Sequence, residues 1–162
     1  MLKTGDLAPP LVATASNGEK VNLADLRGKK NVVLFFYPRD FTRVCTQEVC
    51  GFRDMYEELR SKDTEVVGVS LDSDASHERF REEHKVPFPL VADTDKSIAK
   101  AFGAVGLLRG VLGLAKRVTF VIDKQGKLAG VFEGELSAST HLDGVKSVLA
   151  RLASGTAAKL PD

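Results

Sequence analysis

The sequence predicts an α/β fold in which a central mixed β-sheet is flanked by helices. Short apolar runs rich in β-branched and aromatic residues are typical of buried strands, and amphipathic stretches lie between them. Buried strands that alternate with helices favour parallel βαβ pairing. The turn sequence Asp-Lys-Gln-Gly at 123–126 joins the last two runs and predicts an antiparallel hairpin there. Both kinds of pairing are therefore expected in one sheet.

The strands are predicted from four apolar runs. Residues 31–37 (NVVLFFY) are nearly all apolar and stop at Pro38, as expected for a fully buried strand. The same reasoning predicts strands at 64–71 (TEVVGVSL), at 118–122 (VTFVI) and at 128–132.

The helices are predicted from apolar residues spaced three and four apart. The helix at 42–60 has one apolar face, formed by Cys45, Val49, Phe52, Tyr56 and Leu59. Further helices are predicted at 73–84, with Asp72 or Ser73 as its cap, at 96–102 and at 137–152.

Composition limits the class of protein. The 162 residues approximate one domain of about 150, so we expect one domain over 1–162 with a frayed tail at 154–162. The net charge of +1 argues against nucleic-acid and membrane-surface binding. No apolar run is long enough for a signal peptide or a membrane span, so we expect a cytosolic protein. Two cysteines in the cytosol favour catalysis, redox sensing or metal binding.

The apolar segment 104–116 (AVGLLRGVLGLAK) contains three glycines and has two interpretations. It is either a loop or short helix packed on the body, or an exposed apolar rim for a substrate or a partner chain.

Residues 38–50 (PRDFTRVCTQEVC) carry the chemistry, where a strand is expected to lead into a helix. Cys45 lies in the first turn of the predicted helix, where the helix dipole and free N–H groups favour a thiolate. Thr42 can cap this helix and direct its hydroxyl toward the sulfur, and Pro38 fixes the approach of the loop. The alternative is a buried, inert cysteine.

Cys50 follows five residues later, about 140° around the helix from Cys45. It is expected to face away from the core, near Arg53, Asp54 and Glu57. The two Cα atoms would lie roughly 8.6 Å apart in an intact helix, beyond the ~7 Å that a disulfide tolerates. A disulfide between them would therefore require local unwinding.

Other site chemistries have weaker support. Cys-x4-Cys lacks the usual spacing of a structural zinc site, and a thioredoxin-type Cys-x-x-Cys is absent, so no metal site is predicted. His77, His84 and His141 lie singly in polar stretches and are expected at the surface. A cysteine–histidine catalytic pair stays open.

Pro38, Thr42 and Cys45 match the peroxiredoxin pattern Pro-x-x-x-Thr-x-x-Cys. The runs 37–40 (YPRD) and 45–50 (CTQEVC) resemble the bacterioferritin comigratory protein, or peroxiredoxin Q, subfamily. The opening residues 5–9 (GDLAP) and the run 117–123 (RVTFVID) are also similar to that subfamily. The resemblance extends from residue 3 to about residue 152.

This resemblance implies a thioredoxin-like fold and assigns site roles residue by residue. Cys45 would be the peroxidatic cysteine and Cys50 the resolving one. Thr42 and Arg117 would bind the peroxide oxygens and stabilise the thiolate. The remaining assignments are Pro38, which would shield the sulfur, and Glu48, which would orient Arg117.

The sequence departs from the subfamily at the mouth of the site. Arg43 and Val44 replace the usual Pro-Gly, and Phe41 replaces the usual Asn. Losing the glycine should stiffen the loop. Phe41 and Val44 make the mouth more apolar, which predicts a preference for organic hydroperoxides over hydrogen peroxide.

The expected reaction needs no metal, flavin or haem. The Cys45 thiolate would be oxidised to a sulfenic acid, Cys50 would condense with it, and thioredoxin or a glutaredoxin-like protein would reduce the disulfide. A monomer is expected more than a dimer, as in many members of the subfamily. Two alternatives stay open: a peroxide-responsive redox sensor, and a holdase-type interaction protein that uses segment 104–116.

Overall fold

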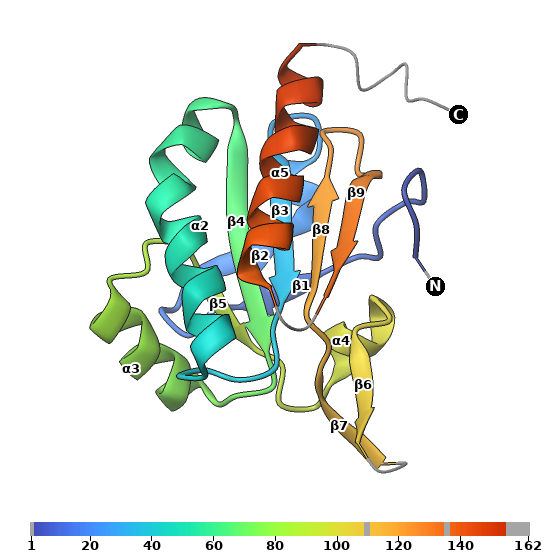
Figure 1. Cartoon of the computed structure of the whole chain (residues 1–162). Coiled ribbons are helices and arrows are strands. Elements are labelled where there is room, and N and C mark those ends of the chain that lie inside the picture. The colour runs from blue at the N-terminus through green and yellow to red at the C-terminus, as the bar shows by residue number, and fades with distance from the viewer. Residues whose placement is uncertain (1, 109–110, 135–136, 155–162) are drawn as a thin grey trace.

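The computed structural model describes residues 2–108, 111–134 and 137–154, with the side chains of 107–113 left outside the description. Its central sheet has five strands in the order β5-β4-β3-β8-β9 (Figure 1). These strands are β3 (Asn31–Phe36), β4 (Thr64–Ser70), β5 (Leu90–Ala92), β8 (Val118–Ile122) and β9 (Leu128–Glu133). Strands β3, β4 and β5 run parallel, whereas β8 is antiparallel to both β3 and β9. The mixed sheet predicted from the sequence is confirmed.

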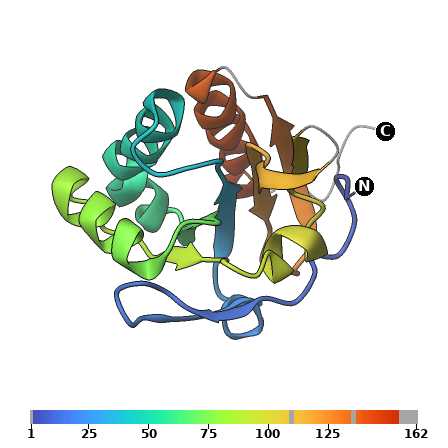
Figure 2. The ribbon, with the colours of Figure 1, turned by 90° about the horizontal axis from the view of Figure 1, so that it is seen from below.

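Helices cover both faces of this sheet (Figure 2). The helices α2 (Arg43–Ser61) and α5 (Ala138–Ala153) lie on one face, with α3 (Asp74–His84) beside them. On the other face lie α4 (Ser97–Ala101), the short helix α1 (Leu23–Leu26) and a small hairpin of β1 (Val12–Thr14) and β2 (Lys20–Asn22).

Alternating residues of β3 contribute to two separate cores, which explains why every residue of the strand after Asn31 is apolar. Val33 and Phe35 pack with the buried residues of α2 and α5. Val32, Leu34 and Phe36 pack into the core on the opposite face. All six residues of β3 are buried, because a strand covered on both faces has no solvent side.

The long helices and strands begin and end close to the predicted residues. Two serine side chains cap the starts of helices. The Ser73 and Ser137 side chains accept hydrogen bonds from the N–H groups of Ser76 and Thr140, at the starts of α3 and α5. The elements that were not predicted are short: β1, β2 and β5 have three residues each and α1 has four. Residues 155–162, most of the tail expected to fray, lie outside the described residues.

The first interpretation of segment 104–116, a loop or short helix, was wrong for the residues that the structure describes. It contains the antiparallel strands β6 (Val105–Leu108) and β7 (Val111–Ala115) (Figure 1). The pairing shifts register around Gly106, where a Cβ would lie only 3.0 Å from the carbonyl oxygen of Leu114. Glycine at such a point permits the bulge and the close approach of the strands. Whether the hairpin forms an apolar rim depends on side chains outside the described set.

Within the described part of the chain, no helix is both long and apolar enough to cross a membrane.

Candidate active site

Cys45 lies where β3 passes into α2, at the end of the sheet where β8 begins. Helix α2 starts at Arg43, so Cys45 occupies its first turn, and its side chain is fully buried. The first backbone bond of the helix runs from the N–H of Thr46 to the carbonyl of Thr42, so the N–H groups before residue 46 are not used inside the helix. These groups and the helix dipole favour negative charge near the sulfur.

Arg117 connects the sulfur to a buried carboxylate. Its Nη2 donates to Cys45 Sγ at 3.3 Å, and its Nη1 donates to Glu48 Oε1 at 3.0 Å. Arg117 is 4% exposed and Glu48 is fully buried. Burial lowers the pKa of the guanidinium, but Cys45 and Glu48 raise it, and the net pKa lies above its ordinary value. Arg117 is therefore a fixed cation beside the sulfur, as the resemblance implies.

Two residues behind Glu48 extend this buried chain, and the sequence reasoning missed both in this role. The Thr119 hydroxyl lies 2.7 Å from His141 Nδ1 and 3.4 Å from Glu48 Oε2. His141 is fully buried, so its expected surface position was wrong. We refer to Glu48, Arg117, Thr119 and His141 as the rear cluster. The sequence could have pointed to Thr119, because it lies two residues after Arg117 and residues two apart in an extended chain share a face.

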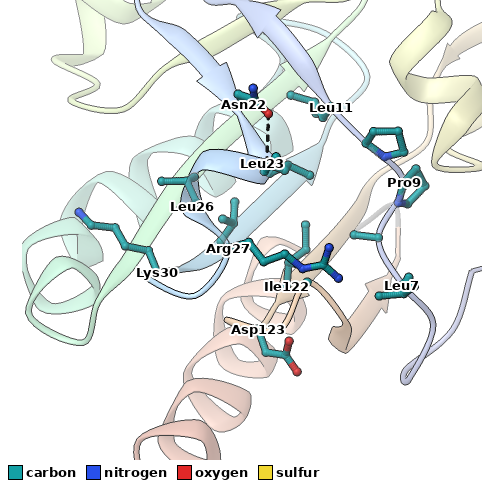
Figure 3. Close-up of a pocket in the computed structure, with 15 residues that line it drawn as sticks. Leu7, Pro9, Leu11, Asn22, Leu23, Leu26, Arg27, Lys30, Ile122 and Asp123 are labelled. Carbon is teal, nitrogen blue, oxygen red and sulfur yellow. Dashed lines mark hydrogen bonds between the residues drawn. The ribbon is translucent and has the colours of Figure 1, made fainter.

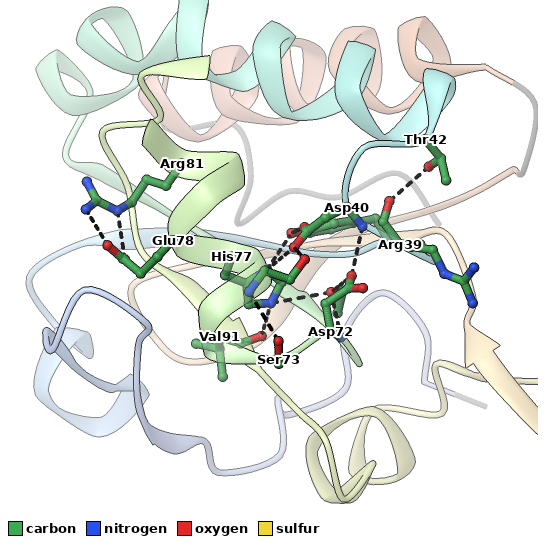
Figure 4. Close-up of polar contacts among 12 residues, drawn as sticks. Arg39, Asp40, Thr42, Asp72, Ser73, His77, Glu78, Arg81 and Val91 are labelled. Carbon is green, nitrogen blue, oxygen red and sulfur yellow. Dashed lines mark hydrogen bonds and ion pairs between the residues drawn. The ribbon is translucent and has the colours of Figure 1, made fainter. Parts of the chain in front are cut away.

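Thr42 is the residue that precedes α2, but its hydroxyl does not cap the helix. Among the described atoms its side chain makes no capping bond; instead Oγ1 donates to the carbonyl oxygen of Arg39 at 2.9 Å (Figure 4). The expected capping bond was therefore wrong. A hydroxyl whose proton is used by Arg39 still presents lone pairs, which can accept a hydrogen bond from a ligand.

The two unusual apolar residues lie on the segment that leads into Cys45, four residues and one residue before it. Phe41 is 47% exposed and packs edge-on against Phe80, with ring centroids 5.1 Å apart. Its φ of 65° lies in the left-handed region, which favours glycine or asparagine. Val44 and Pro38 are half-buried. Phe41 therefore presents an exposed apolar side chain on this segment, and the apolar mouth stays a prediction.

Cys50 lies in the same unbroken helix as Cys45, and both cysteines are free. It is half-buried rather than turned fully outward. Burial raises the pKa of the Cys50 thiol, Arg53 partly offsets this, and Asp54 adds to it. Cys50 is therefore mainly a thiol at neutral pH in this conformation.

A second buried polar cluster holds the loop between β3 and α2. Asp40 accepts from the Tyr37 hydroxyl at 2.7 Å. Asp40 also lies 2.7 Å from His77 Nδ1, while His77 Nε2 faces the carbonyl oxygen of Val91 at 3.1 Å (Figure 4). The Asp72 carboxylate accepts from the N–H of Asp40 at 2.8 Å. We call Tyr37, Asp40, Asp72 and His77 the loop cluster.

The loop cluster corrects a second expectation, because His77 is fully buried and not at the surface. His84 is partly exposed and packs against Phe80. The ligand atoms of Asp40, Asp72 and His77 lie within 4.8 Å of one another and could in principle hold a metal ion. Hydrogen bonds within the protein already engage these atoms, which favours a structural role for the group. Burial and the Asp40 carboxylate raise the pKa of Tyr37 well above its usual value.

A cavity of about 230 Å³ is lined by apolar side chains together with the charged Arg27, Lys30 and Asp123 (Figure 3). Val32 and Ile122, which pair across the start of β3 and the end of β8, both line it. Leu7, Leu23 and Leu26 line it as well. Cys45 follows the other end of β3, so this cavity is not part of the cysteine site.

Comparison with known proteins identifies the class. Residues 4–131 match the model of the AhpC/TSA family, and the chain belongs to this family. It is 40% identical over 131 residues to peroxiredoxin Bcp of Bacillus subtilis, covering 78% of this chain and 82% of that protein. It is 36% identical over 148 residues to the chloroplastic peroxiredoxin Q of Sedum lineare, covering 91% and 78%.

A solved structure extends this similarity to the fold. The peroxidoxin BcpB from Mycobacterium tuberculosis superimposes with a TM-score of 0.86 at 34% identity, covering 94% of this chain and 99% of that one. The resemblance to the bacterioferritin comigratory protein and peroxiredoxin Q group is confirmed, and with it the thioredoxin-like fold. The protein is a thiol peroxidase of the peroxiredoxin class.

Proposed function

We propose that Cys45 reduces peroxides as the peroxidatic cysteine, with Arg117 as its cationic partner. The supporting observation is the 3.3 Å contact between Arg117 Nη2 and Cys45 Sγ at the buried start of α2. The thiolate attacks the terminal peroxide oxygen, the S–O bond forms and the O–O bond breaks. The leaving oxygen takes a proton and departs as water or an alcohol, and Cys45 becomes a sulfenic acid.

Arg117, Thr42 and the first N–H groups of α2 have separate roles in this step. Charge develops on both peroxide oxygens as their bond breaks, and a fixed guanidinium lowers the energy of that charge. The free N–H groups at the start of α2 add donors on the same side. Thr42 accepts a hydrogen bond from the peroxide hydroxyl, because its own proton is held by the carbonyl of Arg39. Pro38 limits the access of water to the sulfur.

Cys50 is the proposed resolving cysteine. Its sulfur attacks the Cys45 sulfenic acid, the S–S bond forms and water leaves. Helix α2 contains both residues, so its first turns must unwind before the sulfurs meet. A thioredoxin-type dithiol then supplies two electrons and restores both thiols.

The experiment is a coupled assay with peroxide, thioredoxin, thioredoxin reductase and NADPH. Wild type should turn over, Cys45→Ser should be inactive, and Cys50→Ser should oxidise once without turning over. Sustained thioredoxin-driven turnover by Cys50→Ser would remove Cys50 from the mechanism. Rapid oxidation followed by very slow reduction would instead favour a redox sensor, and a holdase function would survive Cys45→Ser.

The apolar mouth supports organic hydroperoxides as preferred substrates. Phe41 is exposed four residues before Cys45, and Val44 immediately precedes Cys45. We expect a higher kcat/KM for cumene hydroperoxide than for hydrogen peroxide, and Phe41→Asn should narrow the difference. Equal or better efficiency with hydrogen peroxide would contradict this preference. The cytosolic location, the monomeric state and the single domain stay predictions from the sequence.

A further inference from the structure

The buried chain that begins at Cys45 does not end at the carboxylate behind Arg117. Glu48 uses Oε1 for Arg117, and its Oε2 faces Thr119 Oγ1 at 3.4 Å and His141 Nδ1 at 3.5 Å. Thr119, His141 and Glu48 are all fully buried. They come from three elements, β8, α5 and α2, which this group of polar atoms joins behind the sulfur.

The orientation of the His141 ring is fixed from its far side. Its Nε2 lies 2.9 Å from the carbonyl oxygen of Gly134, which can only accept. Nε2 therefore carries a proton, and Nδ1 is directed at Thr119 Oγ1, 2.7 Å away. Gly134 itself has φ 149° and lies directly after β9, so a backbone turn sets the position of this acceptor.

The proton on Nδ1 decides which way the Thr119 hydroxyl points. A ring protonated on both nitrogens donates to Thr119 Oγ1, which leaves the hydroxyl proton for Glu48 Oε2. A ring without the second proton accepts from Thr119 instead. In the first arrangement His141 Nδ1 donates to Thr119 Oγ1, and Thr119 donates to Glu48 Oε2. The doubly protonated ring then lies 3.5 Å from the Glu48 carboxylate.

We propose that His141 is a positioning residue for peroxide reduction, acting through Thr119 on Glu48 and through Glu48 on Arg117. Held at Oε2 by this pair, the Glu48 carboxylate keeps Oε1 directed at Arg117 Nη1, which in turn keeps Nη2 on Cys45 Sγ. The second nitrogen contact on Gly134 prevents the ring from rotating away. This inference rests on the proposed function, because it assigns His141 a role in the Cys45 reaction.

Two amide substitutions of His141 distinguish the contact of Nδ1 with Thr119 from the contact of Nε2 with Gly134. The amide of asparagine reaches the position of Nδ1, so His141→Asn retains the contact toward Thr119 and loses the one to Gly134. The amide of glutamine reaches the position of Nε2, so His141→Gln retains Gly134 and loses Thr119. Both variants remove the imidazole from a fully buried site, so a purely structural role would affect them similarly.

The measured quantity is the rate constant for oxidation of reduced Cys45 by peroxide. Because the chain contains no tryptophan, the reaction is stopped by rapid quenching with a maleimide and followed by mass spectrometry. Alkylation by iodoacetamide runs in parallel, since it requires the thiolate but no placement of a peroxide. Thermal unfolding of each reduced variant records its stability.

We expect His141→Gln to slow peroxide oxidation about tenfold, roughly the factor carried by one buried hydrogen bond. Alkylation should fall by a smaller factor, and His141→Asn should recover most of the peroxide rate. Thr119→Val should match His141→Gln, and Thr119→Ser, which retains the hydroxyl, should resemble wild type. Equal rates for the Asn and Gln variants, or equal losses in oxidation and alkylation, would overturn the assignment.

The same experiment distinguishes this inference from the proposed function. Wild type and Cys45→Ser are measured alongside the variants. Wild-type oxidation no faster than that of a free cysteine would overturn the proposed function. Fast wild-type oxidation that His141→Gln and Thr119→Val leave unchanged would overturn the role of His141 alone.

Discussion

Two buried polar clusters flank the segment that carries Cys45, and each is built around a fully buried histidine. The rear cluster reaches the sulfur through Arg117, whereas the loop cluster holds Asp40, five residues before the sulfur. Glu48 of the rear cluster lies between Cys45 and Cys50 in helix α2, and Asp40 precedes that helix. The proposed disulfide between Cys45 and Cys50 would require α2 to unwind. In that mechanism the rear cluster would come apart in each cycle, whereas the loop cluster could stay intact.

This difference predicts separate consequences for mutation. Disturbing the rear cluster should change the rate of peroxide reduction, because the proposed mechanism places the charge of Arg117 at the reacting atoms. Disturbing the loop cluster should change mainly the stability of the fold, because its hydrogen bonds close a buried turn.

The largest effect is expected for Arg117→Met. Removing a preorganised donor from the site of developing charge should slow peroxide oxidation by about 100-fold or more. The variant should also unfold about 3–5 kcal/mol more easily, because Glu48 is left buried without the cation that it faces at 3.0 Å. Rapid-quench oxidation and urea unfolding measure the two quantities.

Adding Glu48→Gln to Arg117→Met is the matched control, since it removes the buried negative charge. The double variant should regain much of the stability and none of the rate. A double variant that recovers peroxide oxidation would mean that Arg117 acts only by holding the fold together.

In the loop cluster, Asp40→Asn should lower the free energy of unfolding by about 2–4 kcal/mol, because it weakens charge-assisted contacts to His77 and Tyr37. Tyr37→Phe removes the bond to Asp40 and the longer 3.4 Å contact with His77, leaves the Asp40–His77 pair in place, and should cost about 1 kcal/mol. Urea unfolding gives both values. The folded variants should oxidise within about threefold of wild type, since none of the described contacts of the loop cluster ends on the sulfur. A loss of rate comparable to that of Arg117→Met would remove the distinction between the clusters.

The smallest effect concerns the proposed resolving step, in which Cys50 would attack oxidised Cys45. Since burial raises the pKa of Cys50, its thiolate is scarce at neutral pH and grows about tenfold for each pH unit below that pKa. Disulfide formation after oxidation should therefore accelerate from pH 7 to 8.5. Mass spectrometry of quenched samples would follow the conversion of sulfenic acid to disulfide.

Charges near Cys50 provide the control for this pH effect. Asp54→Asn should speed disulfide formation at a given pH and Arg53→Met should slow it, each by less than about threefold, because solvent screens these side chains. A rate independent of pH would show that unwinding of α2, rather than ionisation of Cys50, limits the step.

The main elements of the fold could be predicted from the sequence. Central strands that are covered on both faces have apolar runs in the sequence, and such runs are easily recognised. The β6–β7 hairpin was missed since its glycines suggested a loop, whereas Gly106 permits two strands to approach closely. The three-residue strands carry too little periodic signal to be recognised.

Both buried histidines were misjudged from the polar stretches around them, although helical spacing contained the correct signal. His77 lies three residues before Phe80, and these two are the buried residues of α3. His141 lies four residues before Val145 and seven before Val148, on the buried face of α5. Contacts between distant elements, such as Thr119 with His141, needed the structure.

The most direct test of the account is rapid mixing of the fully reduced protein with one equivalent of peroxide, comparing wild type with Cys45→Ser. Free thiols are counted before and after the reaction. The account predicts fast loss of both thiols per chain in wild type and no fast loss in Cys45→Ser. Oxidation of wild type at the rate of a free cysteine would contradict it, because the contact between Arg117 and the buried sulfur would then confer no reactivity.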